Sequence, residues 1–225
     1  FPTRRSSDLI SFFQTRIWAQ TGACNFLCNT SFELPGTVGP NSFNFINQTN
    51  VPCWNTTATD GMIEIWGSGF QGVPAYLGTN FVELNANQVS TLYQNFTASL
   101  GATVQIAFAH RGRAGTDVMS VSIGPVGGPY YNFGNFSAGN TAWVYSQLTY
   151  TFPSTGTTSY TIRFVSVSAA GGPTVGNFLD AISVTLPAPS LILQSTTPTC
   201  SNSQNGSIQA IATGGTAPYT YTWSP

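Results

Sequence analysis

Turns divide the sequence into short segments in which apolar and polar residues alternate, and this pattern restricts the chain to a fold made of β-strands. Residues 103–123, TVQIAFAHRGRAGTDVMSVSI, show the pattern most clearly. Every second residue from 104 to 108 is apolar, His110 is in phase with them, and the alternation returns from 119 to 123. A charged, glycine-bearing turn separates the two segments, so we predict a hairpin.

Similar segments follow one another along most of the chain. We predict strands at 29–34, 61–67, 80–86, 91–98, 142–152, 159–168 and 177–186, and loops at 35–52, 67–78 and 124–139. No long helical pattern appears, and a hydrophobic fraction of 41% is enough to build a core. Strands of this length and spacing predict an all-β fold, an antiparallel β-sandwich.

The start of the chain departs from this pattern. Residues 1–9, FPTRRSSDL, resemble the conceptual translation of a synthetic sequencing adapter, and we set them aside as an artefact. Residues 10–20 are apolar and end in Trp18-Ala19-Gln20, which favours the remnant of a secretory signal peptide cleaved after Ala19 over an ordinary first strand. The signal-peptide interpretation predicts an exported chain, and since no stretch reaches the ~20 apolar residues of a membrane span, we expect no membrane insertion.

Four cysteines and a single histidine, without a CxxC pair, exclude the usual zinc sites. In an exported chain, Cys53 can form a disulfide with Cys28 or with Cys24. Either bond would tie the start of the first domain to the loop before Trp54. Cys200 lies far along the chain, and we expect its partner to lie beyond Pro225.

The segment Pro187-Ala188-Pro189 is a short, stiff linker between two domains. Beyond it we predict a turn at Asn205-Gly206 and strands at 207–213 and 219–223. Tyr219, Tyr221 and Trp223 would share one face of the last strand, and a single hairpin cannot bury that face. We therefore expect residues 190–225 to be the first strands of a larger domain.

This second domain resembles the SprB-type repeat. The motifs that carry the resemblance are Cys200, Asn205-Gly206-Ser207-Ile208, Gly214-Gly215, Pro218-Tyr219-Thr220-Tyr221 and Trp223. Such repeats occur in tandem in large surface adhesins of gliding bacteria and in related secreted proteins. The resemblance implies an immunoglobulin-like repeat, secreted or on the outer cell surface of a bacterium, with further repeats of the same polypeptide as neighbours.

The first domain, residues 24–187, resembles the galactose-binding-like jelly rolls, the architecture of many carbohydrate-binding modules. The resemblance rests on Asn29-Thr30-Ser31-Phe32-Glu33, on Trp54, and on Asn177-Phe178-Leu179-Asp180. Modules of this fold often hold a structural Ca²⁺ where the first and last strands meet, which implies Glu33 and Asp180 as metal ligands. The family usually doubles the acid of the last strand, whereas this chain has Asp180-Ala181. Alternatively, both acids accept hydrogen bonds and bind no metal.

Two groups of residues are candidates for ligand binding. The first is the turn of the predicted hairpin, with His110, Arg111, Arg113 and Asp117. Arg113 could pair with a carboxylate or with sugar hydroxyls, while His110 could equally be a hydrogen-bonded core residue and Asp117 could hold an arginine across the turn. The second group combines Asp60, Glu64, Trp66 and Tyr76. An aromatic plate beside carboxylates suits sugar binding, although Trp66 could also pack internally, and for Trp54 we favour the core.

The low charge and the absence of catalytic motifs limit the classes of function that the chain can have. Only 6% of the residues are charged and the net charge is -1, which argues against nucleic acid as a partner. Glu64 and Glu83 could share a surface as a glycosidase pair requires, but no GxSxG, P-loop or dinucleotide motif is present, so we expect no enzyme and no catalytic residue. We predict non-catalytic recognition of an extracellular glycan or another surface polymer, within a larger bacterial adhesin. The alternatives are a ligand-free structural stalk domain and the accessory carbohydrate-binding module of a secreted polysaccharide-degrading enzyme.

Overall fold

A computed structural model describes residues 25–200, 205–215 and 219–223. The expected adapter sequence, the expected signal peptide and Cys24 lie outside these ranges. The chain divides into two compact units, one spanning Cys24–Leu186 and the other containing Pro187–Pro225. The division falls at the start of the segment expected to be a linker. No helix among the described residues is long and apolar enough to cross a membrane.

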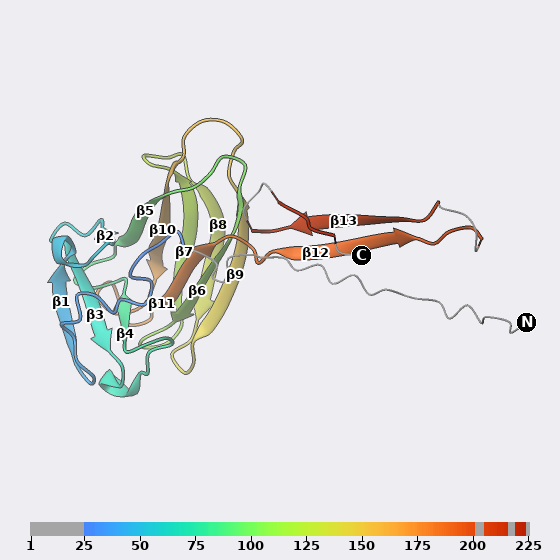
Figure 1. The fold of residues 1–225 in the computed structure, drawn as a ribbon. Helices are drawn as coiled ribbons and strands as arrows, with labels where there is room; N and C mark the ends of the chain where they lie inside the picture. Colours follow the sequence, from blue (N-terminus) through green and yellow to red (C-terminus); the bar gives the residue numbers. More distant parts are fainter. Residues whose placement is uncertain (1–24, 201–204, 216–218, 224–225) are drawn as a thin grey trace, which may run out of the picture. The chain divides into compact units, whose positions relative to one another are not determined.

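The larger unit is an antiparallel β-sandwich of the jelly-roll type, with two sheets facing each other (Figure 1). The six-stranded sheet has the order β1 (Phe43–Asn47), β3 (Met62–Gly67), β4 (Asn80–Glu83), β11 (Phe178–Thr185), β6 (Thr103–Arg111) and β9 (Val144–Thr151). The five-stranded sheet has the order β2 (Asn55–Thr56), β5 (Thr91–Thr97), β10 (Ser159–Ser168), β7 (Asp117–Pro125) and β8 (Tyr131–Ala138). Two short 3-10 helices, η1 (Gln48–Asn50) and η2 (Phe70–Gly72), lie in the connections.

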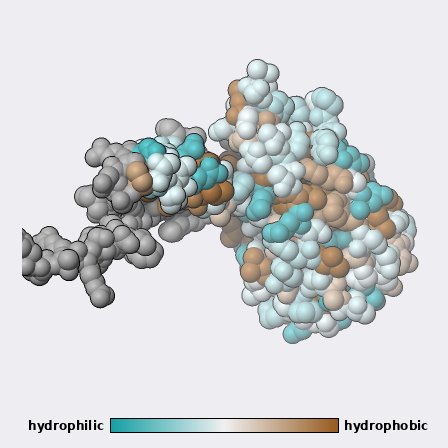
Figure 2. All heavy atoms as spheres, turned by 90° about the vertical axis from the view of Figure 1, so that its right-hand side faces the viewer, coloured by the Kyte–Doolittle hydropathy of each residue, from teal (hydrophilic) through white to brown (hydrophobic). Residues whose placement is uncertain are grey.

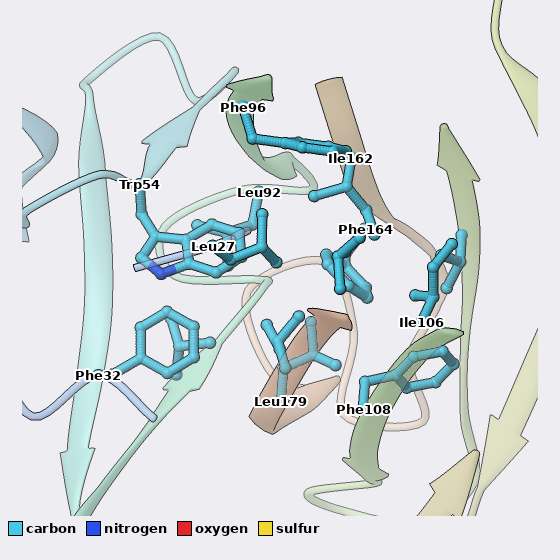
Figure 3. Close-up of a cluster of buried hydrophobic side chains, with 14 of the residues drawn as sticks. Leu27, Phe32, Trp54, Leu92, Phe96, Ile106, Phe108, Ile162, Phe164 and Leu179 are labelled. Carbon is cyan, nitrogen blue, oxygen red and sulfur yellow. The ribbon is translucent and has the colours of Figure 1, made fainter. Parts of the chain in front are cut away.

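The core lies between the sheets, where the apolar residues of the alternating strands meet (Figure 3). Trp54 is 1% exposed, and its ring packs against Phe32 and Phe164 at centroid distances of 5.3 and 6.4 Å. Its indole nitrogen donates to the carbonyl of Asn29 at 2.9 Å, which satisfies the one polar group of this ring. The placement of Trp54 in the core is confirmed.

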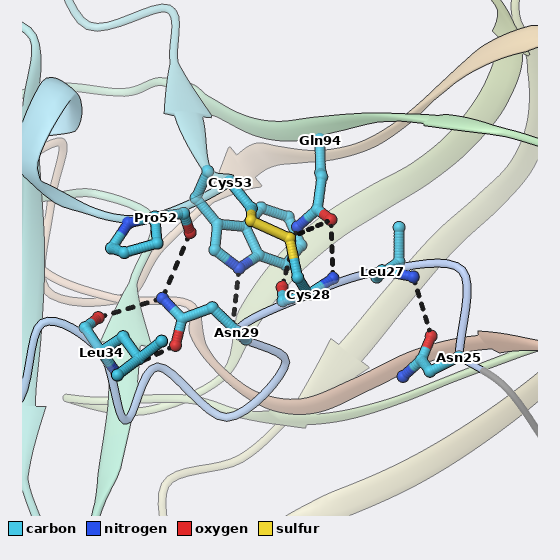
Figure 4. The surroundings of a disulfide bond; sticks show 9 residues. Asn25, Leu27, Cys28, Asn29, Leu34, Pro52, Cys53 and Gln94 are labelled. Carbon is cyan, nitrogen blue, oxygen red and sulfur yellow. Dashed lines mark hydrogen bonds between the residues drawn. A yellow bond between two sulfur atoms is a disulfide. The ribbon is translucent and has the colours of Figure 1, made fainter. Parts of the chain in front are cut away.

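Cys28 and Cys53 form a disulfide, the first of the two pairings expected for Cys53 (Figure 4). The amide of Cys28 donates to the side-chain oxygen of Gln94 on β5 at 2.9 Å. The Asn29 side chain donates to the carbonyls of Leu34 and Pro52. These bonds tie the first described residues to the loop before β2 and to the five-stranded sheet.

Three predicted elements are wrong. Residues 29–34 form turns rather than a strand, because Asn29 adopts φ 50° and its side chain bonds both the amide and the carbonyl of Leu34. Residues 43–47 and 131–138 lie in expected loops but form β1 and β8. Each of these two strands lies at a sheet edge and pairs with one long neighbour, β3 or β7, so the pairing outweighs the weak local pattern.

The predicted hairpin at 103–123 is also wrong, although both of its strands exist. β6 pairs with β9 and β11 in one sheet, whereas β7 pairs with β10 and β8 in the other. The turn between them therefore crosses from sheet to sheet. Both apolar faces still point to the same core, which is why alternation alone cannot distinguish this crossover from a hairpin.

The described part of the second unit contains one antiparallel pair, β12 (Ser190–Thr196) and β13 (Ser207–Thr213). The strand expected at 219–223 is not formed. Tyr219, Tyr221 and Trp223 are exposed, in agreement with the expectation that a single hairpin cannot cover them.

Candidate functional site

The predicted aromatic plate at Trp66 lies beneath the surface. Trp66 faces outward from β3, yet it is 0% exposed, because the loop after β3 folds back and packs Phe70 4.7 Å from its ring. Val73, Phe81 and Phe178 complete this smaller core on the outer side of the six-stranded sheet. The expectation that Trp66 stacks on a ligand is corrected here, because alternation gives the direction of a side chain but not what covers it.

Glu64 and Glu83 are direct neighbours on the same side of β3 and β4. Both side chains are buried, however, so they do not lie on the molecular surface. The Trp66 indole donates to Glu64 at 2.8 Å, and Arg113 donates to both oxygens of Glu83 at 2.9 and 3.1 Å. The Arg113 guanidinium also lies 4.6 Å from the centroid of the Trp66 ring. Burial, reinforced by the charge of Glu64, raises the pKa of Glu83 to about 8, and burial raises the pKa of Glu64. This carboxylate pair is therefore part of the packing under the loop and does not face solvent.

The rest of the predicted turn cluster is a buried hydrogen-bond network. His110 is 1% exposed and its Nε2 lies 3.0 Å from the Asn177 side-chain oxygen; burial lowers the pKa of His110, which favours the neutral ring. Asp117 is fully buried and accepts the backbone amides of Arg113, Ala170 and Asn177. Asp117 thus holds three backbone segments together instead of pairing with a guanidinium across the turn.

Asp60 and Arg111 are closer to the surface, and each is bound locally. Asp60 is exposed and accepts the amide of Met62 and the side chain of Asn87, which fixes the turn before β3. Arg111 donates to the carbonyl of Asn140 at 2.6 Å. Of the eight predicted ligand residues, Tyr76 alone has an exposed aromatic ring with a second exposed aromatic ring, that of Tyr145, beside it.

Tyr76 and Tyr145 form the exposed aromatic platform of the sandwich. Their rings are stacked at 5.7 Å with an interplanar angle of 6°, and they are 44% and 46% exposed. Trp143 meets Tyr76 edge-on at 6.2 Å and donates its indole N–H to the carbonyl of Pro74, which anchors the loop. Sequence reasoning missed Tyr145 and Trp143, although Tyr145 is an outward position of the strand predicted at 142–152.

An uncharged polar surface continues from this platform along the outer face of β6 and β9. Strand register pairs Gln105 with Thr149 and Thr103 with Thr151, and Gln147 lies between Tyr145 and Thr149 on the same face. The Thr103 and Thr151 hydroxyls are 2.9 Å apart. We call these five residues and the platform the polar face. Its amides, hydroxyls and aromatic rings can bind sugar hydroxyls and sugar C–H groups without a charged partner. Figure 2 shows a visible surface of mostly intermediate hydropathy on the larger unit.

Glu33 and Asp180, the predicted metal ligands, hold the loop that carries Tyr76. Asp180 accepts the amides of Tyr76 and Leu77 at 2.8 Å each, and Glu33 accepts those of Thr79 and Asn80. Burial, and to a smaller extent the charge of Glu33, raises the pKa of Asp180 to about 7. Two neighbouring carboxylates suit a divalent cation. The described residues contain no group of three or more metal-ligating side chains, so backbone carbonyls and water would have to complete the shell.

Comparison with known proteins gives one family match. Residues 193–225 match the model of the SprB repeat, as expected from the motifs after the linker. No curated protein matches the chain.

Several solved carbohydrate-binding modules resemble the sandwich. TmCBM61, solved with β-1,4-galactotriose, is 16% identical over 72% of this chain and 98% of its own, with a TM-score of 0.46. The xylan-binding domain from CBM 22 is 17% identical over 63% and 92%, with a TM-score of 0.45. The CBM22 tandem domain from Paenibacillus barcinonensis Xyn10C is 15% identical over 68% and 51%, with a TM-score of 0.47. The strand pairings described above define the topology of the present chain. The galactotriose and xylan ligands belong to the solved modules.

Proposed function

We propose that the sandwich is a non-catalytic module that binds an uncharged polysaccharide on the polar face. The observation that carries this proposal is the parallel, half-exposed pair Tyr76 and Tyr145 at one end of a strip of amides and hydroxyls. Sugar rings stack on such aromatic surfaces through their C–H faces, while Gln105 and Gln147 offer donors and acceptors for hydroxyls. From Tyr145 to Thr151 the strip is about 20 Å long at ~3.4 Å per residue, which suits a chain of sugars better than one monosaccharide.

The setting we propose is a secreted or surface-exposed bacterial adhesin. The SprB repeat match at residues 193–225 supports this setting, because such repeats occur in surface adhesins. A ligand-free stalk domain and the accessory module of a polysaccharide-degrading enzyme remain the competing functions. The polar face argues against the stalk, because a spacer has no need of an exposed, ordered tyrosine pair.

The test is binding of the full chain to neutral polysaccharides, including xylan and β-1,4-galactan, measured by affinity electrophoresis and calorimetry. Tyr145→Ala should weaken binding about five- to thirtyfold, because it removes half of the stacking platform, whose loss costs roughly 1–2 kcal/mol. Tyr131→Ala is the matched control, since Tyr131 is another exposed tyrosine, lies on β8 of the other sheet, and packs on Phe133 and Tyr150 instead of on the platform. Equal binding by the two variants would contradict the assignment of the site, and no binding by the wild type to any neutral polymer would favour the stalk.

We also propose that Ca²⁺ binds between Glu33 and Asp180. The observation that supports this proposal is that both carboxylates bind one short loop: Asp180 accepts the amides of Tyr76 and Leu77, and Glu33 accepts those of Thr79 and Asn80. A cation there would supply the positive charge that this pair lacks. It would stabilise the loop without taking part in ligand chemistry.

A further inference from the structure

The outer face of the five-stranded sheet carries Arg163, which forms no ion pair with any acid among the described residues. Strand register places Tyr93 on β5, Arg163 on β10, Ser122 on β7 and Asn132 on β8 in one row across this sheet. The neighbours of Arg163 along β10, Ile162 and Phe164, are buried in the core, so Arg163 points to the outer face. This face belongs to the other sheet from the polar face.

Of the other two described arginines, Arg113 pairs with Glu83, and Arg111 donates to the carbonyl of Asn140 while its buried Nε has no partner. Among the described residues, no hydrogen bond or ion pair joins the Arg163 side chain; its guanidinium lies 4.5 Å from the centroid of the Tyr130 ring. The six described acids all accept hydrogen bonds elsewhere: Glu33, Asp60, Glu64, Glu83, Asp117 and Asp180. Arg163 is therefore a single positive charge on an otherwise uncharged sheet face.

A guanidinium stacked on an aromatic ring is held in one plane, while its N–H groups remain free at the edge. A planar carboxylate is the partner that fits such an edge, because it can accept two parallel N–H bonds. The neighbouring Tyr93 and exposed Asn132 provide a phenol and an amide, the groups that bind sugar hydroxyls. We infer that this face is a second binding site, which takes an acidic polysaccharide by pairing a uronate carboxylate with Arg163. This inference does not rest on the function proposed for the polar face.

The experiment compares two forms of one polymer, polygalacturonate and its fully methyl-esterified form, with the full chain and EDTA present to prevent bridging by metal ions. The wild type should bind the acid form at least about tenfold more tightly than the ester, as expected for a charge-assisted pair. Added salt should weaken that preference. Arg163→Gln should abolish the preference, and Arg163→Lys should restore only part of it, because lysine keeps the charge but loses the planar fork.

Arg111→Gln is the matched control, because it removes the same charge from the other sheet. It should retain the preference for the acid form, and the thermal unfolding of both glutamine variants should show that each is folded. Equal binding of the two polymers by the wild type would overturn the inference. Equal weakening by Arg163→Gln and Arg111→Gln would do so as well, since it would indicate attraction by net charge alone. Binding of dextran sulfate without binding of polygalacturonate would overturn the assignment to a carboxylate.

Discussion

At the scale of single residues, Gly176 shows how tightly the buried network around Asp117 is built. Gly176 adopts φ 137°, and a Cβ at this position would lie 2.4 Å from an Asp117 carboxylate oxygen and 2.6 Å from Ala169 Cβ. Its amide also donates to Glu83. Gly176→Ala should lower the free energy of unfolding by about 2–3 kcal/mol, because it adds backbone strain to a steric clash.

Urea unfolding measures this effect, and Gly139→Ala is the control. A Cβ on Gly139 would meet nothing within 4 Å, and its φ lies outside the left-handed region. The control should change stability by less than about 0.5 kcal/mol. If the two variants unfold at the same urea concentration, the close packing described around Asp117 is incorrect.

At the scale of elements, the loop after β3 decides which residues can meet a ligand. It buries Trp66 under Phe70 and exposes Tyr76, and the carboxylates of Glu33 and Asp180 fix its end. If Ca²⁺ binds between these carboxylates, the melting temperature should rise by several degrees on changing from EDTA to millimolar CaCl₂, because a ligand of the folded state alone stabilises it. Differential scanning calorimetry measures the shift.

Asp180→Asn should lose most of the shift, because the amide carries no charge. Asp60→Asn should keep it, because Asp60 is an exposed acid bonded to Met62 and Asn87. An unchanged melting temperature of the wild type in CaCl₂ would show that the two acids serve only as hydrogen-bond acceptors for the loop.

The same loop shows which features of the site could not be predicted from the sequence. Alternation gave the inward residues of β3, β4, β6 and β7 correctly, since Ile63, Val82, Ile106 and Val121 are all buried. The same alternation in the sequence places Trp66 and Glu83 on the outward side of their strands, but local periodicity contains no information about a loop that returns to cover them. Sheet membership of β6 and β7 is equally non-local, because it depends on partners tens of residues away. Tyr145 could have been found from the outward positions of its strand, whereas its stacking on Tyr76 could not.

At the scale of the whole molecule, the sandwich offers two outer faces of different chemistry. The polar face has stacked tyrosines, amides and hydroxyls, and the opposite sheet has one stacked arginine among neutral residues. The six described acids accept hydrogen bonds within the chain, and most of these bonds fix loops. The two faces therefore differ in the chemical groups that they expose, and the buried acids make the stability sensitive to pH.

The buried acids give this pH dependence a definite sign. Burial raises the folded-state pKa of Glu83 from 4.5 to about 8, that of Asp180 from 3.8 to about 7, and also that of Glu64. Each group binds its proton more tightly in the folded state, so stability falls as the pH rises from the unfolded to the folded pKa. His110 has the opposite effect, because burial lowers its pKa below 6.5 and its folded form is destabilised as the pH falls below that value.

Between pH 5.5 and 8.5 the loss of stability from the three acids exceeds the gain from His110. We therefore expect the melting temperature to be lower at pH 8.5 by at least about 4 °C, taking 2–4 °C per kcal/mol for a domain of this size.

Glu64→Gln should reduce this difference in melting temperature. At high pH, ionisation of Glu64 and Glu83 would place two negative charges side by side under the Tyr76 loop, and the variant removes one of them. A melting temperature that rises from pH 5.5 to 8.5 would mean that the Glu64–Glu83 pair is ionised in the folded protein. Arg113, which bonds both oxygens of Glu83, would then compensate far more of the buried charge than its partly exposed position suggests.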